Sequence, residues 1–137
     1  MILCEDNYDF SYLNKILDSL STLDLELLFV DSLQMKEINK NTRNIDKTTD
    51  VLSFPHDNTF FNHSFLGSIV INMDLAKEKS IELKHSLEDE ISLLFIHGLL
   101  HLLGYDHEVD SGQMRKKEEE LIKEFNLPKS LIVRTLD

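Results

Sequence analysis

Residues 95–107 read FIHGLLHLLGYDH, and this stretch decides the fold. Its first part is apolar almost all round, which predicts a helix buried at the centre of the protein. His97 and His101 are four residues apart and therefore share one face of that helix. Gly104 should end the helix, so that the chain turns back and brings His107 toward the other two histidines.

Three neutral imidazoles from a helix and the following loop are typical of a catalytic zinc site with one position open for water. We therefore expect His97, His101 and His107 to bind one Zn²⁺ per chain. A lone histidine on an apolar helix is usually a core residue, but two buried rings have four nitrogen atoms that need partners. Structural zinc sites use mostly cysteine ligands, and Cys4 is the only cysteine here, so a catalytic site is favoured. Only tertiary folding could bring in a fourth ligand from the remaining histidines, which are His56, His63 and His85.

Gly98 occupies the position at which the His-Glu-x-x-His helix of zinc peptidases carries its general base. The third histidine also follows sooner than in the extended metzincin motif. Peptide hydrolysis by the usual route is therefore disfavoured, although a metal that activates water does not strictly need that glutamate. Asp106 either orients His107 or its water, or caps the turn after Tyr105, and both interpretations stay open.

The composition is typical of one globular domain over residues 1–137, with 42% hydrophobic and 28% charged residues. A single cysteine excludes an internal disulfide and fits a cytoplasmic setting. We expect neither a secretory signal, because the N-terminus lacks a basic region, nor a membrane span. The net charge of −11 opposes RNA binding at long range. An RNA enzyme of this charge would need a basic patch, the charge of a metal ion or a partner that delivers the substrate.

Strands and helices alternate unevenly, which predicts an α+β fold with a mixed four-stranded sheet and helices around the buried central helix. The expected strands are residues 1–5, 25–30, 51–54 and 66–72, with a short strand or docking tail at 131–133. The expected helices are residues 8–20, 32–42, 74–82, 91–103 and 114–125. Their expected caps include Ser32, Asp74 and Ser86. The charged run at 115–120 is expected to be the solvated face of the last helix.

A second polar cluster precedes the third strand and comprises Asn39, Arg43 and residues 49–55. A guanidinium in this cluster could clamp a phosphate with two hydrogen bonds. On composition alone, however, a solvated helix face is the favoured interpretation. Basic residues spaced by 4, 3 and 4 would share that face of a helix, and they are Lys36, Lys40, Arg43 and Lys47.

Together the two clusters resemble the YbeY family of bacterial endoribonucleases. The family pattern His-Gly-x-Leu-His-Leu-x-Gly-Tyr-Asp-His is matched without a gap at residues 97–107. Asn39, Arg43 and residues 49–55 match the family pattern Asn…Arg…Thr-Asp-Val-Leu-Ser-Phe-Pro. Residues 66–69 match the family's Leu-Gly-Asp-Ile strand at three of four positions. Ser68 stands where the family usually has Asp. The spacing of the three histidines, compared with the metzincin motif, predicts a metzincin-like zinc geometry without the peptidase base.

The resemblance implies a zinc-dependent, single-strand-specific endoribonuclease that acts in 16S rRNA 3′-end maturation and ribosome quality control. By position it makes His97, His101 and His107 both zinc ligands and catalytic residues. It also makes Arg43 a catalytic residue that stabilises transition-state charge, which reverses the solvated-face interpretation for this arginine. Attack by water and by the ribose 2′-hydroxyl are both open.

The partners that the resemblance implies are ribosomal RNA, the small ribosomal subunit and an Era-type GTPase. A partner that presents the RNA would offset the acidic charge of the chain. Two other functions share the same residues: a zinc-dependent peptidase, and a non-catalytic ribosome assembly factor with a structural metal.

Overall fold

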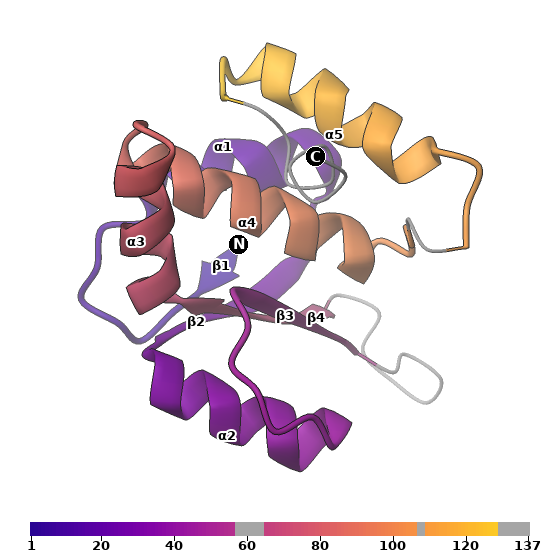
Figure 1. The fold of residues 1–137 in the computed structure, drawn as a ribbon. Coiled ribbons are helices and arrows are strands. Elements are labelled where there is room, and N and C mark those ends of the chain that lie inside the picture. The colour runs from indigo at the N-terminus through magenta and orange to yellow at the C-terminus, as the bar shows by residue number, and fades with distance from the viewer. Residues whose placement is uncertain (57–64, 107–108, 129–137) are drawn as a thin grey trace.

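The computed structural model describes residues 1–56, 65–106 and 109–128 (Figure 1). A four-stranded mixed sheet has the helix α2 on one face and the helix α4 on the other, with the remaining helices on the α4 side (Figure 1). The predicted α+β fold with a mixed four-stranded sheet is therefore confirmed. Within the described residues, no helix has both the length and the apolar character needed to cross a membrane.

The sheet has the strand order β1-β2-β4-β3, which leaves β3 at an edge. β1 and β2 pair in parallel, as do β2 and β4, whereas β3 and β4 are antiparallel. The strands are β1 (Ile2–Leu3), β2 (Asp24–Val30), β3 (Val51–Pro55) and β4 (Phe65–Asn72). They match the predicted strands, except that β1 is shorter than the predicted residues 1–5. The element predicted at 131–133 lies outside the described residues.

All five predicted helices are present, with ends displaced by a few residues. They are α1 (Ser11–Leu20), α2 (Ser32–Arg43), α3 (Met73–Glu82), α4 (Leu87–Leu102) and α5 (Gln113–Glu124). Ser86 caps α4 as predicted, but the other two predicted caps are wrong. Asp31 caps α2 in place of Ser32, and Asn72 caps α3 in place of Asp74. The Asp74 carboxylate instead accepts a hydrogen bond from the Ser32 backbone N–H, so it serves the neighbouring helix.

The helix α4 forms the centre of the main core, and eleven of its sixteen residues are buried. It packs on β3 and β4 and against α1, α3 and α5. A smaller apolar cluster of Met35, Leu52 and Val70 fills the space between α2 and the opposite face of the sheet. Because α4 is enclosed by other elements, the backbone that carries the histidines is held firmly.

Two glycines determine how α4 is placed. Gly98 faces the sheet, and a Cβ atom there would lie 3.0 Å from both Ile69 Cγ2 and Ser53 Oγ. The Ser53 hydroxyl donates a hydrogen bond of 3.0 Å to the Gly98 carbonyl oxygen. Gly104 follows the helix with a φ of +99°, and its N–H donates to the His101 carbonyl oxygen. The predicted helix end at Gly104 is confirmed, and the chain turns back directly after the histidine pair.

Candidate metal centre

His97 and His101 lie together on one face of α4, near its C-terminal end. Their Nε2 atoms are 3.3 Å apart, and the rings are nearly perpendicular with centroids separated by 4.8 Å. Tetrahedral zinc with Zn–N distances of about 2.0–2.1 Å separates two ligand nitrogen atoms by about 3.3 Å. The histidine pair therefore has the spacing of two ligands of one ion, although a shared proton between the rings would also fit this distance.

Glu118 of α5 supplies the carboxylate beside the histidine pair. The residue is 0% exposed, and its Oε1 atom lies 3.6 Å from His97 Nδ1. Neither of its carboxylate oxygens makes a hydrogen bond within the described part of the chain. His97 thus presents one ring nitrogen to His101 and directs the other toward a buried carboxylate, which is the arrangement of a carboxylate–histidine pair at a metal site.

The prediction that residues 115–120 form a solvated face is wrong at Glu118. Its charged neighbours Glu119 and Glu120 are about half exposed, as expected for a solvated face. Glu118 is instead buried together with Met114 and Leu121. These three residues are spaced by four and three, so they occupy one face of the helix. The spacing from the flanking apolar residues was the signal that could have identified Glu118 from the sequence.

The turn before α5 positions this helix. The Asp110 carboxylate accepts hydrogen bonds from the backbone N–H groups of Gly112 and Met114, at 2.8 and 3.0 Å. The Asp106 carbonyl oxygen in turn accepts from the Asp110 N–H at 3.1 Å. Asp106 therefore takes part in the turn through its backbone, and a role for its side chain in orienting His107 stays a prediction. These bonds fix the first turn of α5, about one turn before Glu118.

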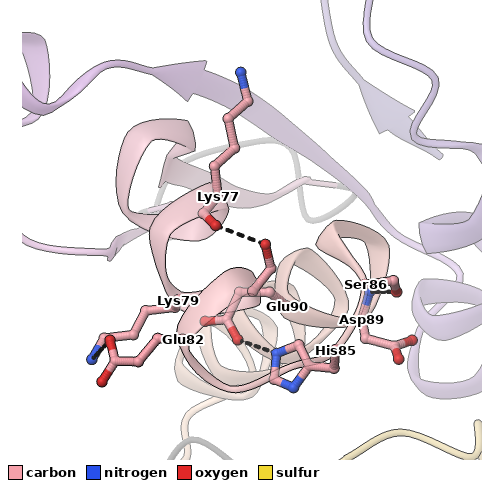
Figure 2. Close-up of polar contacts among 8 residues, drawn as sticks. Lys77, Lys79, Glu82, His85, Ser86, Asp89 and Glu90 are labelled. Atoms are coloured by element: carbon pink, nitrogen blue, oxygen red, sulfur yellow. Dashed lines mark hydrogen bonds and ion pairs between the residues drawn. The ribbon is translucent and has the colours of Figure 1, made fainter.

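The third predicted ligand, His107, lies outside the described residues. Among the residues that are described, no group of three or more His, Cys, Asp or Glu has an arrangement that could hold a metal ion. His85 does not join the pair, because it precedes α4 and its Nε2 lies 2.8 Å from Glu90 Oε1 (Figure 2). At a rise of about 1.5 Å per residue, the helix separates its own start from His97 by about 15 Å.

Arg43 is the last residue of α2 and is exposed. The helices α2, which ends at Arg43, and α4, which carries the histidine pair, lie on opposite faces of the sheet (Figure 1). The predicted basic stripe is interrupted, because Lys47 follows the end of α2. Asn39 is buried, and its side-chain amide donates to the Lys47 carbonyl oxygen at 2.9 Å. Asn39 thus has a structural role, in which it holds the connection between α2 and β3.

Ser68 lies on the same face of β4 as Val70, which faces α2. Its hydroxyl donates a hydrogen bond of 3.0 Å to the Glu26 carboxylate on the neighbouring strand β2. A carboxylate therefore lies beside this position although the residue itself is serine. The Ser68–Glu26 pair is on the side of the sheet opposite α4, so it belongs to a different surface from the histidine pair.

Comparisons with known proteins agree with the resemblance. A family model described as Endoribonuclease YbeY matches residues 9–126. A protein named Endoribonuclease YbeY from Campylobacter jejuni (strain RM1221) is 63% identical, over 100% of this chain and 99% of the relative. A relative of the same name from Campylobacter fetus subsp. fetus is 57% identical over 98% of both chains. The solution structure of TM1509 from Thermotoga maritima superposes with a TM-score of 0.61 at 27% identity, covering 91% of this chain and 89% of the other.

Proposed function

The chain belongs to the endoribonuclease YbeY family, and from this premise we propose that it is a zinc-dependent endoribonuclease that cleaves single-stranded RNA. The observation that carries the zinc dependence is the 3.3 Å separation of the Nε2 atoms of His97 and His101. The buried Glu118 carboxylate beside His97 supports it further, because a bound cation would offset this negative charge.

The proposed ion is held by His97, His101 and His107. Imidazole nitrogen suits zinc, although such sites also accept nickel, copper and iron. The two described histidines fit such an ion, since they present Nε2 atoms from one face of a buried helix. Bound there, the ion would supply Lewis-acid polarisation at the scissile phosphate. The likeness to metzincins is part of this proposal and extends to the histidine helix alone.

The protein's own groups orient the ligands and bind the substrate. Gly98 and Ser53 hold α4 against the sheet, which fixes the direction of the histidine rings. Arg43 is proposed to clamp an RNA phosphate through its guanidinium. Because α2 and α4 lie on opposite faces of the sheet, an RNA strand that contacts both helices must cross a sheet edge (Figure 1). This placement favours substrate positioning over direct contact of Arg43 with the reacting phosphate.

The proposed biological substrate is ribosomal RNA, in 16S rRNA 3′-end maturation and ribosome quality control in the cytoplasm. The net charge of −11 supports a mechanism in which partners present the RNA, because the chain repels a polyanion at long range. The small ribosomal subunit and an Era-type GTPase are the proposed partners.

The peptidase alternative requires a general base on the histidine helix. A glutamate at residue 98 would need space where a Cβ atom alone lies 3.0 Å from Ile69 and from Ser53. The close packing of α4 on the sheet therefore disfavours a glutamate at this position, which is where peptidases of this type carry their base. Cleavage of casein by wild-type protein, lost in His101→Ala, would revive this alternative.

The proposed function is tested by cleavage of a single-stranded RNA that ends in the ribosomal 3′ precursor. Zinc-loaded wild type is compared with His101→Ala, each with and without a chelator. His85→Ala is the matched control, because its histidine is paired with Glu90 away from the metal ligands. Cleavage by wild type and His85→Ala that is lost in His101→Ala and with chelator supports a metal-dependent ribonuclease.

Two other outcomes would contradict the proposal. Cleavage that survives His101→Ala would point to a contaminating nuclease. Stoichiometric zinc binding without cleavage, combined with a lower melting temperature of His97→Ala, would favour an assembly factor with a structural metal. The ends of the product identify the nucleophile, because a 2′,3′-cyclic phosphate excludes direct attack by water in the first step.

A further inference from the structure

We propose that Glu118 is the positioning residue of the metal centre. Its carboxylate accepts the Nδ1–H of His97 and thereby directs Nε2 of the same ring toward the ion. This inference rests on the proposed metal dependence, and it adds to the three predicted ligands a residue from α5.

The chemistry of the imidazole ring requires such an acceptor. A neutral imidazole carries one N–H, so a ring that binds a cation through Nε2 carries its proton on Nδ1. That N–H fixes the orientation of the ring when it is bonded to a carboxylate or carbonyl oxygen. In His97 the Nδ1 atom lies 3.6 Å from Glu118 Oε1, whereas Nε2 faces His101. A shift of about 0.6–0.8 Å brings Nδ1 and Oε1 to hydrogen-bond distance.

Contacts within α5 do not explain why the Glu118 carboxylate is buried. The next two glutamates of this helix are paired on the surface, Glu119 with Arg115 at 3.3 Å and Glu120 with Lys117 at 3.5 Å. Glu118 is instead 0% exposed, and its carboxylate makes no hydrogen bond within the described residues. Buried carboxylates in folded proteins are normally hydrogen-bonded, paired with a cation or close to a metal. A cation held by His97 supplies the missing positive charge across the ring.

A purely structural role for Glu118 predicts a different behaviour. If the carboxylate only fastened α5 to α4, its loss would destabilise the protein equally with and without metal. If it orients His97 for an ion, the metal-free protein holds a buried charge that lacks its counter-charge. Neutralising Glu118 should then leave the metal-free protein as stable as wild type or more so, and should weaken metal binding.

The experiment measures zinc affinity by competition with a chromogenic chelator and melting temperature without metal, for wild type and Glu118→Gln. The matched controls are Glu119→Gln and Glu120→Gln, which make the same chemical change at adjacent exposed positions. We expect the zinc dissociation constant of Glu118→Gln to rise about 10–100-fold. Its metal-free melting temperature should be equal to that of wild type or higher, and both controls should match wild type in both measurements. Visible absorption of the Co²⁺-loaded proteins should change for Glu118→Gln alone.

Three outcomes would overturn the inference, and they are distinguishable from one another. Equal zinc affinity of Glu118→Gln and wild type would remove the positioning role and leave the proposed metal site intact. A lower metal-free melting temperature of Glu118→Gln, or failure of that variant to fold, would identify a structural tie. Absence of zinc binding by wild type would overturn the metal dependence and, with it, this inference.

Discussion

Gly98→Ala tests whether close packing on the sheet determines the position of the histidine helix. In an unobstructed helix this change stabilises the protein by about 1 kcal/mol. Here the new Cβ would lie 3.0 Å from Ile69 Cγ2 and Ser53 Oγ, and 3.3 Å from Ile69 Cγ1. Overpacking of this kind costs about 1–3 kcal/mol. A displaced Ser53 hydroxyl would also lose its hydrogen bond to the Gly98 carbonyl oxygen, at about 1 kcal/mol.

The expected net effect is therefore a decrease of about 1–3 kcal/mol in the free energy of unfolding. Urea denaturation monitored by circular dichroism measures it, provided that the m-value is unchanged. The matched background is Ser53→Ala, which removes one of the three contacting atoms. Gly98→Ala should cost at least about 0.5 kcal/mol less in that background. An increase in stability of Gly98→Ala close to the helix-propensity value would show that the contact with the sheet is not as close as described.

Further changes probe the other parts of the structure. Chelator should lower the melting temperature of wild type but not of His101→Ala. Zinc at about 100 times its dissociation constant should add about 2.7 kcal/mol to the free energy of unfolding of wild type alone. Equal shifts in both proteins would argue against the ligand role of His101. Asn72→Ala should lower the free energy of unfolding by about 2–4 kcal/mol, because the buried side-chain amide caps α3 and donates to Thr48 Oγ1 and the Thr49 carbonyl oxygen. A loss under about 0.5 kcal/mol, measured by urea denaturation, would contradict this network. Ser68→Asp should destabilise the protein by up to about 1 kcal/mol at low ionic strength, because the new carboxylate lies beside Glu26. This loss of stability should vanish in high salt or when Glu26→Gln is also present. A loss that persists under both conditions would indicate a steric cause. Arg43→Gln should weaken binding of single-stranded RNA without changing zinc affinity, whereas a change in zinc affinity would place Arg43 closer to the metal ligands than the fold indicates.

The histidine helix was predictable because the residues that determine it lie within the helix or directly after it. Apolar residues on all sides require burial, a four-residue spacing brings His97 and His101 to one face, and Gly104 provides the left-handed conformation that ends the helix. Each of these depends only on residues within the helix or directly after it. The helix boundaries differed from the prediction because caps compete, as when Asp31 reaches the free amides of α2 in place of Ser32.

The features that escaped prediction depend on how separate elements meet. Glu118 lies in a run of charged residues whose composition indicates a solvent-exposed face. Its burial follows from the rotation of α5, which the Asp110 carboxylate sets at the first turn, and from the packing of that helix on α4. Arg43 is a similar case, since the resemblance indicates its importance but not the side of the sheet on which α2 lies. The side of the sheet on which α2 lies cannot be read from the periodicity of a single element, whereas the burial of Glu118 is indicated by its spacing from Met114 and Leu121 within α5.

Gly98 connects the packing of the fold with its chemistry. The residue that removes the peptidase base is also the one that lets α4 lie against Ile69 and Ser53, so a glutamate there would displace the helix that carries the histidines. The glycine thus suits the close packing of this helix on the sheet. A carboxylate can reach the histidine pair from the opposite direction, where α5 packs, and there Glu118 lies beside His97 Nδ1 rather than beside Nε2. From that side, Glu118 is placed to orient the His97 ring. A general base that takes a proton from the attacking nucleophile must therefore come from another part of the chain or from the RNA itself.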